Sequence, residues 1–278
     1  ANARGYFCVT VIMSIVMVPV FWLCAAGCKE KYTEQLHGSQ SAEKMGLIKS
    51  LKEIVKNDQL LMVVLTTVLG TICVSGRMGL LTYYIIYVVG DFRVIATVFT
   101  SMTIAQLIGT LTVPWGTKTF TKKGYLIILN VIMCIGFFLL FINPHCNQTY
   151  LLVVSFICGL TNSASAICPG MVSDCIEYGD WKLGRRQEGI AASMLSFGVK
   201  LSTAISGSAG VLLLSAAGYV ANAEQTPAAQ QGINIVVNLV PLIVAALSIV
   251  PLLFYKLTPK KVEEIRADLD AGKRACDK

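Results

Sequence analysis

A lysine within an apolar run is the first residue whose position suggests chemistry. Lys200 lies in Ser-Phe-Gly-Val-Lys-Leu-Ser-Thr, inside a stretch long enough to cross a membrane. A basic side chain in the middle of a bilayer costs about 2.5–3.5 kcal/mol on insertion scales, so it normally faces a wet cavity and has a partner. Ser196, Thr203 and Gly207 share its helical face and predict a polar pathway for a solute. The alternative is that Lys200 extends its amine to the membrane surface.

An arginine in a second apolar run poses the same question. Arg77 lies within Ser-Gly-Arg-Met-Gly, deep in that run. Its guanidinium could bind a sugar hydroxyl or a carboxylate through two parallel hydrogen bonds. The alternative is a structural pair with a carboxylate or a helix-end carbonyl. Tyr84, with Tyr83 and Tyr87 beside it, is a further candidate for the pathway, although tyrosines near a membrane surface also form interfacial belts.

Acidic and basic residues mix in the segment 171–189, where another apolar run ends. Such a cluster can form ion pairs in one conformation and break them in another, which predicts a gate. A solvated charged loop is the alternative, and spacing alone does not separate the two. The residues of the predicted gate are Asp174, Glu177, Asp180, Arg185, Arg186 and Glu188, with Lys182 between them.

The elements that carry these residues are apolar runs. Of 278 residues, 55% are hydrophobic and 14% are charged, against about 25% charged in a soluble protein. A run of about 18 apolar residues can cross the hydrocarbon core of a bilayer. The sequence therefore predicts an all-α membrane protein with about seven spans, at 6–28, 60–89, 94–116, 125–143, 150–172, 189–219 and 233–255.

The basic residues predict an orientation. The formal net charge of +7 would suit nucleic acid, but the lysines and arginines lie between the spans, so topology explains them better and no nucleic-acid partner is expected. Basic residues follow the first, third, fifth and seventh spans, whereas the alternate loops hold Arg93. The positive-inside rule then places the N-terminus outside and the C-terminus in the cytoplasm. The apolar residues at 44–57 and 260–271 recur at helical spacing, which predicts helices along the cytoplasmic surface.

Other chemistry finds little support. The ten cysteines are mostly embedded in the apolar runs and are interpreted as small membrane residues, and no metal site or cofactor is expected. The two histidines lie in predicted loops, which argues against a haem or metal enzyme in the membrane. The chain has no phosphate-binding loop, GxSxG or HExxH motif, so an enzyme is not expected.

The charged segment resembles a known family. Asp174-Cys-Ile-Glu-Tyr-Gly-Asp-Trp-Lys-Leu-Gly-Arg-Arg-Gln-Glu-Gly, followed by Phe197-Gly-Val-Lys-Leu, is similar to the signature of the glycoside–pentoside–hexuronide:cation symporters, a branch of the major facilitator superfamily. Lys56-Asn-Asp-Gln-Leu and Tyr83-Tyr-Ile-Ile-Tyr-Val-Val-Gly also match. The resemblance covers most of the chain and is specific at the charged segment, because the motif there is long and mixed in type.

The resemblance implies a twelve-span transporter of which this chain is a C-terminal fragment. The seven spans look like the sixth to the twelfth, which agrees with an opening that lacks an initiator methionine. Residues 1–28 would end the N-terminal half and 29–58 would form the central cytoplasmic loop. Residues 59–257 would form the six-helix C-terminal bundle and 258–278 the cytoplasmic tail. The expected location is the bacterial inner membrane.

The resemblance also implies roles. Lys200 falls on a lysine of the eleventh helix that is implicated in the cation and sugar sites. Asp174 and Glu177 fall on acidic positions that are thought to help gate the transporter. The coupling ion would be sodium or a proton, held mostly by aspartates of the absent N-terminal half. The expected partners are membrane lipids, that half and a small sugar or glycoside, with uronides and pentosides among the candidates.

Two other functions stay open at this point. A transporter of the same superfamily could carry a lipid or an organic anion, and sugar competition against lysolipids would separate it from a sugar symporter. A membrane anchor or assembly subunit without transport would tolerate neutral residues at Arg77 and Lys200. The sequence does not give the sugar, the coupling ion or the oligomeric state.

Overall fold

The structure is a computed structural model that describes residues 3–27, 56–145, 147–184, 188–221, 223 and 225–275. The described residues form helices and short connections, in agreement with the predicted all-α membrane protein. They divide into two units, residues 1–47 and 48–278. All but the last two residues of the surface helix predicted at 44–57 lie outside the described residues, and so does nearly all of the predicted loop 29–58.

The described residues of the first unit form the helix α1 (Ala3–Gly27). Its residues from Phe7 to Gly27 are long and apolar enough to cross a membrane, which agrees with the span predicted at 6–28. Large apolar side chains along it are exposed within the unit, as in Trp22 at 81%. An apolar surface of this kind requires lipid or protein around it.

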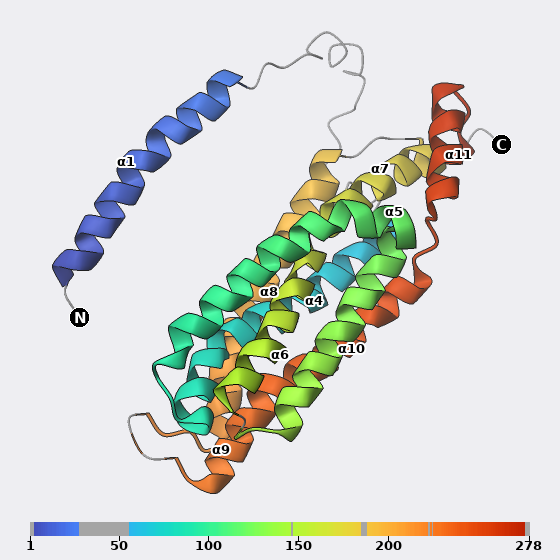
Figure 1. Ribbon diagram of the computed structural model, residues 1–278. Helices are drawn as coiled ribbons and strands as arrows, with labels where there is room; N and C mark the ends of the chain where they lie inside the picture. Colours follow the sequence, from blue (N-terminus) through green and yellow to red (C-terminus); the bar gives the residue numbers. More distant parts are fainter. Residues whose placement is uncertain are drawn as a thin grey trace. The chain divides into compact units, whose positions relative to one another are not determined.

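The second unit is a bundle of long helices (Figure 1). Several of its spans are interrupted by short π-helical or 3₁₀ segments. The elements are α4 (Asp58–Tyr84) with the π-helical η1 (Ile85–Val89), α5 (Val94–Ile142), α6 (Gln148–Thr161), the 3₁₀ segment η2 (Asn162–Ala166), α7 (Cys168–Leu183), α8 (Glu188–Ala216), α9 (Pro227–Asn234), the π-helical η3 (Ile235–Leu239), α10 (Val240–Phe254) and α11 (Pro259–Asp270).

The helix α5 folds back on itself at Thr121. A straight helix of its 49 residues would be roughly 70 Å long, more than twice the hydrocarbon core. Thr121 has φ 67° and ψ 158°, which no helix can accommodate. Across the turn, the hydroxyls of Thr112 and Tyr125 lie 2.7 Å apart, and the Tyr125 ring packs on Gly116. The two arms correspond to the spans predicted at 94–116 and 125–143.

Six described helices are long and apolar enough to cross a membrane, and α5 supplies two crossings. The result agrees with the seven predicted spans. One boundary differs in a way that matters for the site. The fifth span, predicted at 150–172, continues as α7 to Leu183, so Asp174, Glu177 and Asp180 lie on a helix.

Small residues bring α8 close to α4. Along one face of α8, every fourth residue is small and buried: Gly198, Ser202, Ser206 and Gly210. A side chain added at Gly198 would lie 3.0 Å from Val68, and one added at Gly210 would lie 3.2 Å from Leu80. Small residues at this spacing allow the two helices to approach closely.

One end of the bundle gathers the basic residues, and we call it the basic end. Polar contacts hold its parts together. The Asn57 side chain donates to the Cys175 carbonyl at 2.8 Å, and Lys123 donates to the Tyr255 carbonyl at 2.8 Å. The start of α4, the Thr121 turn, the end of α7 and the connection from α10 to α11 therefore meet there. Its basic residues are Lys56, Lys118, Lys122, Lys123, Lys182, Lys256, Lys260, Lys261, Arg266, Lys273 and Arg274.

Candidate functional site

A partly open cavity of about 470 Å³ lies between the helices of the bundle, and its wall mixes apolar side chains with hydroxyls and amides. Residues of α4, α5, α6, η2, α7, α8 and α10 contribute to its wall, so every long element of the second unit takes part. Ten of the nineteen lining residues carry a hydroxyl or an amide. They are Thr66, Thr67, Thr71, Ser75, Gln106, Asn130, Thr161, Asn162, Ser165 and Ser248.

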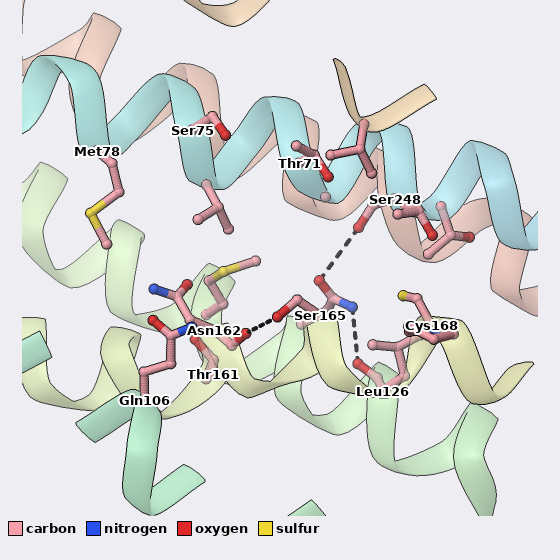
Figure 2. A pocket seen from close by; sticks show the side chains of 18 of the residues that line it. Thr71, Ser75, Met78, Gln106, Leu126, Thr161, Asn162, Ser165, Cys168 and Ser248 are labelled. Atoms are coloured by element: carbon pink, nitrogen blue, oxygen red, sulfur yellow. Dashed lines mark hydrogen bonds between the residues drawn. The ribbon is translucent and has the colours of Figure 1, made fainter. Parts of the chain in front are cut away.

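The cavity lies near mid-depth in the spans. Its α4 residues, Thr66 to Met78, occupy the middle of a helix that runs with η1 from Asp58 to Val89. Ser75 and Thr71 of α4 lie across the cavity from Asn162 and Ser165 of η2 (Figure 2). Breaks in membrane helices are tolerated where they line a cavity, which explains a 3₁₀ segment at this depth.

Several polar atoms of the wall have hydrogen-bonding capacity to spare. Asn130 donates to the Leu126 carbonyl at 2.9 Å, and Ser248 donates to Asn130 at 3.5 Å. The Thr66 hydroxyl is buried and makes no hydrogen bond with any described residue. Buried polar groups are normally paired, so this hydroxyl is available to a bound polar molecule or water.

The predicted pathway residues of α8 lie beside the cavity rather than in its wall. Leu195 and Val199 line it, whereas Ser196, Lys200 and Thr203 are exposed on the adjacent face of the helix. That face therefore has no packing partner within the described second unit. Lys200 directly follows Val199, so its Cα lies near the edge of the cavity.

Arg77 is buried, and its surroundings are apolar. It is 2% exposed, and its Nε and Nη2 atoms make no hydrogen bond with any described residue. Its guanidinium carbon lies 4.8 Å from the centre of the Phe137 ring. The structural pair considered from the sequence, with a carboxylate or a helix-end carbonyl, is therefore not present among the described residues.

Tyr84 lies in the apolar core, away from the cavity. Its side chain is fully buried, and its hydroxyl donates to the Pro144 carbonyl at 3.2 Å. Its neighbours Tyr83 and Tyr87 each pack edge-on against Tyr219, with ring centres 5.3 Å apart. These contacts tie the end of α4 to its neighbours at the end of the bundle opposite the basic end.

The acidic residues of α7 are paired in the structure. Asp174 contacts Lys122 at 2.6 Å, Glu177 contacts Arg266 at 2.6 Å, and Asp180 contacts Arg274 at 3.3 Å. Asp174 and Asp180 are also buried, so this part of the cluster is not a solvated loop. The Glu177 carboxylate raises the pKa of Arg266 further above its usual range.

Of the remaining residues of the predicted gate, the structure describes only Glu188. Glu188 lies in the first turn of α8, and Arg185 and Arg186 lie outside the described residues. The sequence analysis did not identify the basic partners Lys122, Arg266 and Arg274. It also missed the cavity amides of Gln106, Asn130 and Asn162. Polar side chains within apolar runs are costly unless they serve a purpose, and that signal could have identified the amides.

A helical membrane bundle with a polar cavity at mid-depth is the architecture of a solute carrier. Comparison with known proteins gives the family: residues 1–259 match the family described as MFS/sugar transport protein, and the chain belongs to it. This confirms the resemblance to the sugar symporter branch of the major facilitator superfamily. It also agrees with the expectation of a transport protein rather than an enzyme.

Two curated relatives are similar along nearly the whole chain. The isoprimeverose transporter of Lactiplantibacillus pentosus is 28% identical over 273 residues, which cover 97% of this chain and 56% of that protein. The glucuronide carrier protein homolog of Escherichia coli is 28% identical over 274 residues, which cover 95% of this chain and 57% of that protein. The chain thus spans about half the length of the curated relatives that it matches.

Proposed function

We propose that this chain forms one half of a secondary transporter that moves a sugar or glycoside together with sodium or a proton. The observation that carries the proposal is the polar cavity at mid-depth in a chain of the sugar transport family. Its volume of about 470 Å³ lies within the range of about 300–1,000 Å³ that is typical of small-molecule sites. One relative is named as a transporter of isoprimeverose and another as a glucuronide carrier homolog, and both names support a sugar as the solute.

The wall of the cavity supplies the groups that a sugar requires. Sugar hydroxyls both donate and accept hydrogen bonds, and side-chain amides and hydroxyls do the same. Asn130, Asn162 and Gln106 provide amides from two different elements. Lys200, Ser196 and Thr203 would meet the solute at the edge of the cavity, where their exposed face is free to turn toward it.

The coupling ion would bind mainly outside this bundle. None of the side chains that line the described cavity is a carboxylate, and carboxylates are the usual ligands of a sodium ion or a coupling proton. A second bundle, equivalent to the N-terminal half of a twelve-span transporter, would supply those carboxylates. It would also cover the exposed polar face of α8 and complete the cavity.

Alternating access would follow from rocking of the two bundles about the cavity. The basic end would face the cytoplasm. There the pairs of Asp174, Glu177 and Asp180 would brace α7 and α11 as one rigid piece of the gate. Arg185, Arg186 and Glu188, at the connection between α7 and α8, would supply the charges that meet the second bundle when that side closes.

Accumulation of labelled sugars in proteoliposomes that hold the complete transporter tests the proposal. Isoprimeverose and methyl β-D-glucuronide would be offered with and without a sodium or proton gradient. We expect gradient-driven accumulation of at least one of them. The variant Lys200→Ala should lose accumulation, whereas Lys118→Ala, which removes an exposed lysine at the basic end, should keep it.

Normal accumulation by the Lys200→Ala variant would refute the role of that lysine. Failure of every sugar to accumulate, with the protein folded and inserted, would refute the proposed function. Competition by lysolipids or organic anions would then identify the alternative solute. Sugar entry that only equilibrates the two sides and is the same with and without an ion gradient would indicate a facilitated carrier and refute the coupling.

A further inference from the structure

The guanidinium of Arg77 is a buried positive charge that no acidic residue of the described bundle neutralises. It is 98% removed from solvent, yet Nε and Nη2 have no acceptor and no described carboxylate pairs with it. Arginine cannot relieve this by losing its proton, because its pKa is too high. The face of Phe137 offers a cation–π contact but leaves the N–H groups of Nε and Nη2 without acceptors. The Nε and Nη2 atoms can therefore donate hydrogen bonds to an anion.

A second cavity, of about 10 Å³, adjoins the large one and has the Arg77 side chain in its wall. The two share Val74, Met78 and Asn162 in their walls. In Figure 2, Met78 extends from α4 toward the side of the cavity that carries Asn162. Methionine is unbranched and flexible, so its movement would join the two cavities at little cost. The amide of Asn162 lies at the same junction and could donate to the same ligand.

We propose that Arg77 is a subsite for an anionic group on the transported sugar, a carboxylate or a sulfonate. The proposal rests on the proposed function and deepens it by naming the chemical class of the solute. The sugar ring would occupy the large cavity among its amides and hydroxyls. Its oxyanion would pass Met78 and accept two parallel hydrogen bonds from the guanidinium. Neutral sugars would leave Arg77 unpaired and would bind less tightly.

A matched pair of probes tests this assignment: methyl β-D-glucuronide and methyl β-D-glucoside. Their uptake is measured for the wild-type transporter and for the variants Arg77→Gln, Arg77→Lys and Arg93→Gln. We expect the wild type to prefer the glucuronide at least tenfold and Arg77→Gln to lose that preference. Arg77→Lys should keep part of it, because a lysine retains the charge but not the paired geometry. The exposed Arg93 is the control and should not affect the preference.

A stability readout separates this role from a structural one. An unpaired buried charge destabilises the empty protein, so Arg77→Met should keep or raise its Tm without ligand. The glucuronide should raise the Tm of the wild type and leave that of Arg77→Met unchanged. This binding readout does not require transport, so it tests the anion site even if no sugar accumulates and the proposed function fails.

Three results would overturn the inference. The first is a wild type that treats the two probes alike or prefers the glucoside. The second is an Arg77→Gln variant that loses both probes equally, or an Arg77→Met variant with a lower Tm, since either would mean that the arginine only supports the fold. The third is a Tm that chloride alone raises as much as the glucuronide does, since the site would then hold an inorganic anion.

Discussion

At the scale of single residues, two glycines determine how closely α5 and α6 pack. A Cβ atom built on Gly159 of α6 would lie 2.6 Å from the Met102 carbonyl oxygen and 2.8 Å from the Ala105 side chain. Gly109 of α5 faces the Leu160 carbonyl oxygen in the same way. The obstacle is backbone in both cases, so no side-chain rotation relieves it. These contacts fix the position of η2, which follows α6 and carries Asn162 into the cavity.

The variant Gly159→Ala should therefore be destabilised by about 1–3 kcal/mol, as is typical of overpacked sites. Thermal unfolding followed by intrinsic fluorescence of the solubilised protein measures the effect. The matched control is Gly79→Ala on α4, where nothing lies within 4 Å of the added methyl group. Alanine has the higher helix propensity, so the control should be as stable as the wild type or up to about 1 kcal/mol more stable. Equal Tm values for the two variants would contradict the close packing.

The residues of the candidate site were predictable only where a charge made them conspicuous. Lys200 and Arg77 stand out because a charged side chain is rare in an apolar run. The amides of Asn130 and Asn162 were not identified, because a single amide in such a run also occurs as a packing contact between helices. Whether Lys200 lies in the cavity wall or beside it depends on the rotation of α8, and residue types alone do not determine that rotation. Only the packed bundle reveals it.

At the scale of elements, the helix α11 is held to the basic end by both apolar and charged contacts. Val262 and Ile265 are buried, and Leu269 is partly buried against the core of that end. Arg266 contacts Glu177, and the Trp181 indole donates to Asp268 at 3.2 Å. The apolar spacing predicted a helix lying on a surface. It could not predict that the helix packs on α7, because the spacing of apolar residues within one helix does not identify charged partners on another.

Removing one charged side chain should loosen α11 without unfolding the bundle. The variant Arg266→Gln breaks the 2.6 Å pair with Glu177 and the longer contact of 3.8 Å with Asp174. Arg266 is exposed, and an ion pair of an exposed side chain contributes about 1 kcal/mol or less. Hydrogen exchange in residues 259–270 should therefore become severalfold faster, while exchange in α5 stays unchanged. The control is Glu264→Gln, an exposed residue of the same helix. Unchanged exchange in Arg266→Gln would show that the apolar contacts alone hold the helix.

At the scale of the whole molecule, the bundle separates charge between its two ends. The Thr121 turn makes this separation possible, because it returns the chain to the basic end between two spans. Without that turn, α5 would be one crossing and the residues after Ile142 would emerge at the basic end. The apolar runs predicted the number of spans well because a bilayer fixes their length. Their ends were predicted less well, since α7 continues beyond its apolar part as a charged helix.

The positive-inside rule then predicts the side on which each end lies. We expect the Thr121 turn and the C-terminus in the cytoplasm and residues 143–147 on the outer side. Fusions of green fluorescent protein, which fluoresces only in the cytoplasm, and of alkaline phosphatase, which is active only outside it, report the side. They would be placed after Arg93, Lys123, Asn147 and Lys278.

The fusions after Arg93 and Asn147 together distinguish the two possible paths of α5, because these residues flank the helix. Phosphatase activity at both, with fluorescence after Lys123, requires that α5 cross the membrane twice. Opposite results after Arg93 and Asn147 would mean a single crossing and would contradict the turn at Thr121, even though six apolar helices would remain. The reverse pattern, with phosphatase activity after Lys123 and Lys278, would keep the fold but invert it, and the proposed gate would then face the outer side.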